Sequence, residues 1–239
     1  MLLKERSVFE YFIPHSSEEN KNSTAICYFQ SQRSTEDIKF YGLNFFLFIM
    51  MRHYAFQMLR TKEQLGYIVM CAPLIIHKML GGAITVHSPK KDPDYLVHRI
   101  NVYLEEQKVR FDNLTDEDFE KNKQSIITMK SVKDIKLSEA ANRAWNEVYN
   151  ELYMFDRQER EIEAIKNITK QELVNYFNET IYTNCRRINV KIICKNHTEN
   201  PEVEAKELNQ KYYEENCLSV IDIDPENIQE FQEMNTFQT

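Results

Sequence analysis

The stretch Leu59-Arg60-Thr61-Lys62-Glu63-Gln64-Leu65-Gly66-Tyr67-Ile68-Val69 is where the chain passes from one regular structure to another. Before it, apolar residues recur every three or four positions, which predicts a helix with one buried face. After it comes a short apolar run that is typical of a strand, and Gly66 stands at the break. The stretch therefore joins the end of a predicted helix to the start of a predicted strand.

The helix before this stretch is predicted from its apolar period. Thr35 and Asp37 give it a polar start, as helices prefer. Arg60 and Lys62 fall near its end, where cations interact favourably with the helix dipole. Its buried face is expected to hold Phe40, Leu43, Leu47, Met50, Tyr54 and Met58.

Strands are predicted on both sides of this helix. Residues 8–13 and 24–30 are short runs rich in aromatic and β-branched side chains. Residues 67–72 are expected to form a central strand, and residues 81–86 a second strand that pairs with it as a hairpin with a long loop. The last strand is expected at residues 187–194, where apolar and polar side chains alternate.

Several more helices are expected between the hairpin and the last strand. One carries Leu96, Ile100, Tyr103 and Leu104 on a single face, and another begins at Ser138. Three more begin at capping patterns, whose first residues are Thr115, Asp156 and Thr169. The helix that begins near Ser138 has an apolar stripe, which we expect to lie in the core together with Phe155. The members of this stripe are Ala141, Trp145, Val148, Tyr149 and Leu152.

The end of the chain has a different composition. Residues 195–217 are dense in Glu, Asn and Lys, and we interpret them as a solvated linker. The apolar residues from Leu218 to Ile223 suggest that the chain docks once more. The expected organisation is a domain over residues 1–195, followed by a charged linker and docking tail over 196–239. Strands first, helices later and a closing strand predict the α+β class, a sheet backed by helices.

Charge and cysteine content restrict the function. The net charge of −7 argues against a nucleic-acid binder, which needs a concentrated basic face. The five cysteines include no Cys-x-x-Cys pair, which favours a reducing compartment, and we expect a cytoplasmic protein with free thiols. The longest apolar stretch, Asn44–Met51, is too short to cross a membrane, and no secretory signal is recognised at the start.

Arg60 and Tyr67 are the candidate functional residues. A guanidinium is always charged and offers a planar fork of donors, and a tyrosine hydroxyl can also donate. Donors held on rigid elements stabilise a peptide carbonyl as it becomes tetrahedral. The structural alternative makes Arg60 a helix-terminal cation and Tyr67 a strand residue whose hydroxyl meets water. Lys62, Glu63 and Gln64 are expected in a solvated turn.

Other chemical sites find little support. No Gly-x-Ser-x-Gly and no Cys/His signature of a nucleophile is present, and four glycines are too few to favour a phosphate-binding loop. His77 and His87 could meet across the expected hairpin and hold a metal, although a surface pair is the simpler interpretation. The exposed edge of the strand at residues 81–88 could accept a substrate strand, or neighbouring protein could cover it.

The residues of the opening stretch also carry a family resemblance. Leu-Arg-Thr-Lys-Glu-Gln-Leu-Gly-Tyr resembles the signature in the C-terminal half of the pitrilysin (inverzincin) zinc peptidases of the insulin-degrading enzyme and nardilysin type. The resemblance spans roughly residues 7–194. It continues through Tyr95-Leu96, Arg99-Ile100, Asn113 to Phe119, Leu137-Ser138-Glu139, Trp145 to Val148, Tyr153 to Arg157, Lys166, Thr169-Lys170 and Leu173.

The resemblance implies a metallohydrolase-like domain of the mitochondrial-processing-peptidase or pitrilysin type. The family's zinc motif, His-x-x-Glu-His, does not occur among the six histidines, so the resemblance is to the half without metal. It implies that an N-terminal half holds the zinc and that Arg60 and Tyr67 face this zinc across a closed chamber. It also implies that these two residues bind peptide substrates in that chamber. The chain would then be inactive alone. The alternative is a non-catalytic peptide-binding or regulatory module that pairs with a full-length relative, and a homo-oligomer stays open.

Overall fold

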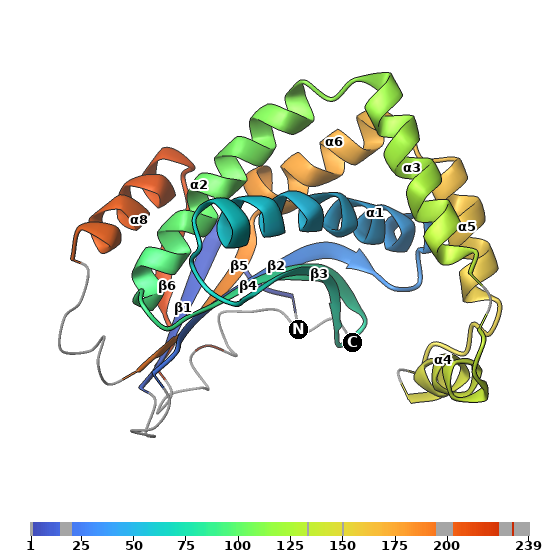
Figure 1. Cartoon of the computed structure of the whole chain (residues 1–239), viewed down its shortest axis with the longest axis horizontal. Coiled ribbons are helices and arrows are strands. Elements are labelled where there is room, and N and C mark those ends of the chain that lie inside the picture. The colour runs from blue at the N-terminus through green and yellow to red at the C-terminus, as the bar shows by residue number, and fades with distance from the viewer. Residues whose placement is uncertain are drawn as a thin grey trace.

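The computed structural model describes residues 2–14, 21–132, 134–149, 151–194, 203–224 and 231. These residues form a mixed sheet in the order β3-β4-β2-β5-β1-β6, with helices packed on one face (Figure 1). The predicted α+β class, a sheet backed by helices, is therefore confirmed. The strands are β1 (Ser7–Pro14), β2 (Ser23–Ser34), β3 (Ile68–Ile76), β4 (Met79–Ser88), β5 (Arg186–Ile193) and β6 (Ser219–Asp222).

Helices make up the second layer. Two of them, α1 and α6, continue without a break into π-helical segments, η1 and η2. No helix in the described part of the chain is long and apolar enough to span a membrane. In chain order the helical elements are α1 (Ile38–Ala55), η1 (Phe56–Lys62), α2 (Pro93–Asp112), α3 (Asp116–Lys130), α4 (Leu137–Tyr149), α5 (Arg157–Lys166), α6 (Lys170–Asn178), η2 (Glu179–Thr183) and α8 (Val203–Glu215).

Most of the expected helix starts are capped as the sequence predicts. Asp37, Thr115 and Thr169 each accept a hydrogen bond from a backbone N–H in the first turn of α1, α3 and α6. Asp156 precedes α5 but makes no such bond, and it instead accepts from Arg160 Nε at 2.8 Å. Three of these four polar residues therefore fix a helix terminus, and the fourth forms a surface ion pair.

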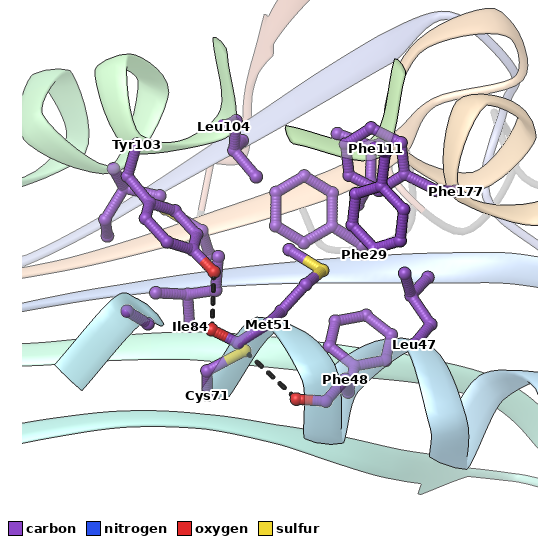
Figure 2. Close-up of a cluster of buried hydrophobic side chains, with 14 of the residues drawn as sticks. Phe29, Leu47, Phe48, Met51, Cys71, Ile84, Tyr103, Leu104, Phe111 and Phe177 are labelled. Atoms are coloured by element: carbon purple, nitrogen blue, oxygen red, sulfur yellow. Dashed lines mark hydrogen bonds between the residues drawn. The ribbon is translucent and has the colours of Figure 1, made fainter. Parts of the chain in front are cut away.

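The core lies between the sheet and α1, α2 and α6 (Figure 2). Phe48 and Met51 of α1 are fully buried and pack towards the sheet and α2. Their backbone carbonyls are used as well, because Tyr103 Oη donates to Met51 O at 2.8 Å and Cys71 Sγ lies 3.7 Å from Phe48 O. Of the face predicted for the first helix, Leu43, Leu47 and Met58 are buried, whereas the other three residues are partly buried and pack against the core, namely Phe40, Met50 and Tyr54.

The β3–β4 hairpin differs from the expectation. Ile76 pairs with Met79, so the turn contains only His77 and Lys78, both with left-handed backbone (φ 48° and 63°). The prediction of a long loop is therefore wrong. A tight turn with left-handed backbone normally contains glycine or asparagine, and neither occurs in this turn, so the sequence did not indicate it. β3 is an edge strand and not a central one. β4 pairs with both β3 and β2, so the edge at residues 81–88 is not open to a substrate strand.

The end of the chain is more structured than its composition indicates. The prediction of a solvated linker over residues 195–217 is wrong for α8, because this helix packs against α2. Asn209 donates to Asp94 O at 2.9 Å, and buried Tyr213 lies 2.9 Å from the amide of Asn189. The helix buries polar side chains, so its apolar period is weak. Residues 195–202 lie outside the described part, and a domain boundary near 195 stays a prediction. Beyond α8, β6 returns to the sheet beside β1.

α4 is a helix where one was predicted, but its apolar stripe does not lie in the core. Trp145 is 63% exposed and Phe155, after the helix, is 62% exposed. Glu147 is the one buried side chain among the described residues of α4. The expectation that Trp145 and Phe155 are core residues is therefore wrong, because amphipathicity predicts a buried face without specifying what buries it.

Candidate functional site

The segment that carries Arg60 is a π-helical extension of α1. Glu63 N donates to Met58 O at 2.9 Å, five residues back, and Leu65 N donates to Leu59 O at 3.0 Å. Met58 and Leu59 are buried, so the wider turn is held to the core. Short π-helical segments inside helices occur frequently at functional sites, because they change the direction of one side chain relative to the helix.

Arg60 and Tyr67 lie side by side although six residues separate them. The guanidinium carbon of Arg60 is 4.6 Å from the ring centre of Phe56 and 4.8 Å from that of Tyr67. Rings hold a guanidinium flat while leaving its N–H groups free. Within the described ranges, Arg60 has no hydrogen-bond or ion-pair partner, and neither does the Tyr67 hydroxyl. Tyr67 is 81% exposed. Two hydrogen-bond donors without a partner among the described residues therefore lie together on one surface.

Gly66 brings these two residues together. An added Cβ at Gly66 would lie 1.7 Å from the carbonyl oxygen of His87 in β4, so no side chain fits there. The backbone at Gly66 must pass directly against the end of β4 before β3 starts. Tyr67 is consequently placed at the entrance to β3, in reach of η1.

The turn between η1 and β3 is fastened by an ion pair. Arg99 of α2 donates from Nε and Nη2 to the two carboxylate oxygens of Glu63, at 2.6 and 2.7 Å. The expected solvated turn is wrong for Glu63, which is largely buried, whereas Lys62 and Gln64 are exposed. Sequence reasoning missed this pair because its members are 36 residues apart, and nothing local marks Glu63 as different from its neighbours.

The face of the sheet away from the helices continues this surface. In β3, Val69 and Cys71 point into the core, while Ile68, Met70 and Leu74 are exposed. Alternation along a strand places these three on the same face. An exposed apolar strip thus runs along β3 from the end that carries Tyr67.

A metal site is not found in the described residues, where no group of three or more His, Cys, Asp or Glu side chains could hold an ion. His77 lies in the β3–β4 turn and His87 near the far end of β4, so the two are about 25 Å apart. Neither a two-histidine metal site nor a surface pair exists there. His87 Nδ1 instead lies 3.1 Å from Thr24 Oγ1. The residues that the structure describes therefore do not fit the zinc of the resembled family.

Fold and site together define a class of domain: a helix-backed sheet that carries an exposed, stacked arginine–tyrosine pair and has no zinc ligand set among its described residues. Comparison with known proteins agrees. Residues 46–145 match the family model described as PQQ synthase PqqF-like, C-terminal lobe domain 4. The chain superimposes on the crystal structure of pitrilysin with a TM-score of 0.74 and 17% identity, covering 100% of this chain and 24% of pitrilysin.

Sequence relatives narrow the class. Human nardilysin is 35% identical over 158 residues, which cover 65% of this chain and 14% of nardilysin. Human insulin-degrading enzyme is 32% identical over 132 residues, which cover 55% of this chain and 13% of that enzyme. The chain belongs to the pitrilysin-type (M16) peptidases as a domain of the C-terminal lobe, similar to that of nardilysin and insulin-degrading enzyme. It spans about a seventh of the length of these relatives.

Proposed function

We propose that this chain is the substrate-binding C-terminal part of an insulin-degrading-type zinc metalloendopeptidase. In this proposal Arg60 and Tyr67 donate hydrogen bonds to the substrate peptide, and the exposed face of β3 forms part of the wall of the chamber. The observation that carries the proposal is the stacked Arg60–Tyr67 pair, whose donors have no partner among the described residues. A buried or paired arginine would have favoured a structural role instead.

The physical basis is the charge that develops on a peptide carbonyl during hydrolysis. A tetrahedral oxyanion is stabilised most by donors that are already in place, because no reorganisation is needed as the charge forms. Arg60 is held between two rings, and Tyr67 is held by the start of β3. The Tyr67 hydroxyl would donate to the carbonyl oxygen, and the Arg60 guanidinium would fix the adjacent backbone or share the charge.

The other parts of the reaction are assigned elsewhere. The described residues offer no zinc ligand set, so we propose that an N-terminal half, on the same or a separate chain, holds the zinc. The isolated chain is then inactive towards peptides. None of the five cysteines forms a disulfide, which supports a cytoplasmic enzyme.

The test is Tyr67→Phe in the assembled peptidase. The change removes one donor and little volume, so kcat should fall on the order of 10²- to 10³-fold while KM changes much less. Tyr149→Phe, an exposed tyrosine on α4, is the matched control and should leave kcat unchanged. An unaltered kcat in a folded Tyr67→Phe assembly would reject the donor role.

The alternative is a non-catalytic module that binds peptides or pairs with a full-length relative. It is favoured by the missing zinc ligand set in the part of the chain that the structure describes. The coding sequence next to this chain separates the two. A His-x-x-Glu-His motif in the same frame, or in a co-expressed chain, supports the peptidase, and its absence supports the module.

A further inference from the structure

The helices α1, α2 and α3 enclose a hollow in the helical layer, with a volume of about 660 Å³. In Figure 1 these three helices lie as the sides of a triangle, with α1 as its base. A hollow of this size that combines apolar side chains with a few polar groups falls within the range of small-molecule sites. The apolar part of its lining includes Ile49, Met50, Phe111, Leu114 and Ile126.

Gln107 lines the hollow from α2 and carries a donor that the fold leaves unused. The residue is only 3% exposed, and its amide nitrogen Nε2 has no hydrogen-bond partner among the described residues. A buried donor without a partner is costly, because it has lost its contact with water and gained nothing in return. The last side-chain torsion of glutamine is broad, so a small rotation turns this nitrogen towards the hollow.

Arg110 supplies a positive charge to the same hollow. It follows Gln107 by three residues, which places the two side chains on one side of α2. Its guanidinium carbon lies 4.1 Å from the ring centre of Tyr54, and no carboxylate pairs with it in the described part of the chain. Glu106 instead accepts a hydrogen bond from Tyr54 Oη. A guanidinium stacked on a ring can still donate from its edge, so Arg110 can bind an anion.

The other titratable side chains of the lining limit the charge of a ligand. Asp118 accepts a hydrogen bond from Thr115 Oγ1 at 2.9 Å, so its carboxylate already serves the start of α3. His53 also lines the hollow and is exposed. One uncompensated guanidinium and one amide donor suit a single negative charge, whereas a doubly charged phosphate would be repelled more strongly by Asp118. A carboxylate attached to an apolar body fits both the donors and the apolar lining.

We propose that this hollow is a binding site for an organic carboxylate with an apolar body. The carboxylate accepts hydrogen bonds from the Arg110 guanidinium and the Gln107 amide, and the apolar body packs against Phe111 and Leu114. The inference does not depend on the proposed function. The hollow belongs to the helical layer, whereas the exposed strip of β3 lies on the opposite face of the sheet.

Binding of 2-naphthylacetate to this chain tests the proposal. Chemical-shift changes in the ¹⁵N-labelled chain should give a dissociation constant of about 1 mM or lower, as expected for a ligand of about 14 non-hydrogen atoms. The side-chain amide signal of Gln107, identified by its absence from Gln107→Leu, should be among those that shift. The probe 2-naphthylacetamide has the same apolar body without the charge, and it should bind about tenfold more weakly.

Substitution of Arg110 separates a built site from an apolar hollow. Arg110→Gln should weaken binding of 2-naphthylacetate about fivefold to tenfold and bring it close to that of 2-naphthylacetamide. Arg160→Gln, the same change at an exposed position on α5, is the control and should bind like the wild type.

Three outcomes would overturn the proposal. They are no binding of 2-naphthylacetate at about 10 mM, equal binding of the acid and its amide, and equal binding by Arg110→Gln and Arg160→Gln. If Gln107→Leu does not fold, Arg110→Gln still decides the question, because Arg110 is exposed and its replacement leaves the core intact.

Discussion

At the scale of single residues, the positions of Arg60 and Tyr67 depend on neighbours outside the proposed donor pair. Gly66 lets the backbone pass against β4, and Glu63 ties the turn to Arg99 of α2. Both constraints act on the few residues between η1 and β3. The geometry of the candidate site can therefore be tested by substitutions that leave Arg60 and Tyr67 unchanged.

Gly66→Ala should destabilise the domain. The new Cβ would lie 1.7 Å from His87 O, and a backbone atom cannot move aside as a flexible side chain can. We expect a loss of at least about 2 kcal/mol in the free energy of unfolding, measured by urea denaturation. Gly42→Ala is the control, because its Cβ would meet only side-chain atoms at 3.3–3.7 Å. Equal stability of the two variants would show that the turn at Gly66 is not constrained.

The Glu63–Arg99 pair should show a measurable coupling energy. Both side chains are mostly buried and the hydrogen bonds are bidentate. A double-mutant cycle of Glu63→Gln and Arg99→Gln should give about 1–2 kcal/mol in unfolding free energy. In the assembled peptidase each single variant should lower kcat, since the turn positions Arg60 and Tyr67. If the effects of the two single substitutions on the unfolding free energy were additive and kcat were unchanged, the ion pair would have no role in positioning the turn.

At the scale of elements, helix termini couple stability to pH. Glu172 accepts from the backbone N–H of Thr169 in the capping box of α6 and pairs with Lys39 of α1. The hydrogen bond from Lys39, followed by that from the Thr169 backbone, lowers the pKa of Glu172 from 4.5 to about 2. A carboxylate with a depressed pKa in the folded state stabilises the fold above its unfolded value and loses that contribution as it protonates.

Glu172→Gln should therefore destabilise the domain at neutral pH but not in acid. At pH 7 we expect a loss of about 1 kcal/mol, the size of a helix cap, because solvent screens the exposed pair with Lys39. The difference between variant and wild type should shrink as pH falls from about 4.5 to about 2. Urea titrations at a series of pH values measure this, with Glu207→Gln on α8 as the control. A difference that does not depend on pH would exclude a charge effect.

Elements with strong local signals could be predicted from the sequence. The α1 face follows a clear period of three to four residues, and Thr115 and Thr169 occupy positions typical of caps. The order of the strands in the sheet could not be predicted, because the side-chain pattern of a strand does not show which other strand its backbone pairs with. α8 was missed since its contacts with the domain are made largely by Asn209 and Tyr213 through hydrogen bonds.

For the candidate site, the sequence indicates the two residues but not the contacts that hold them. Arg60 and Tyr67 were singled out by residue type and by resemblance, and the structure brings them together. The contacts that hold them come from residues far along the chain, namely Arg99 and His87. α4 shows the same limit in another form, because its amphipathic pattern predicts an interface, while the side that lies against the domain depends on the Glu147–Arg157 pair.

At the scale of the whole molecule, thiol reactivity reports the integrity of the core. None of the five cysteines forms a disulfide, and Cys217 alone among them is exposed. Burial raises the pKa of Cys71 and Cys185 to about 12, so their reactive thiolate forms are scarce at neutral pH. The folded chain should thus release one equivalent of thionitrobenzoate rapidly from a disulfide reagent.

Unfolding in denaturant should raise the count to five. Cys217→Ser should abolish the rapid equivalent without changing the four that appear on unfolding. Recovery of three or fewer thiols after unfolding, in the absence of reductant, would contradict the reduced state of the chain. Rapid reaction of several thiols in the folded chain would contradict the burial of the other four cysteines.

The position of β1 has a consequence for biosynthesis. β1 precedes the other described strands of this sheet in the chain, yet it lies between β5 and β6, with Ser7 paired to Arg186 on one side and to Ser219 on the other. At ordinary rates of translation, roughly 10 to 35 seconds separate the emergence of β1 from that of its first partner. During that interval its aromatic side chains have no native neighbour strand. The nascent chain can form the hairpin and α1 early, but the sheet closes only near the end of synthesis, so a ribosome stalled before β5 would carry an unpaired, aggregation-prone strand.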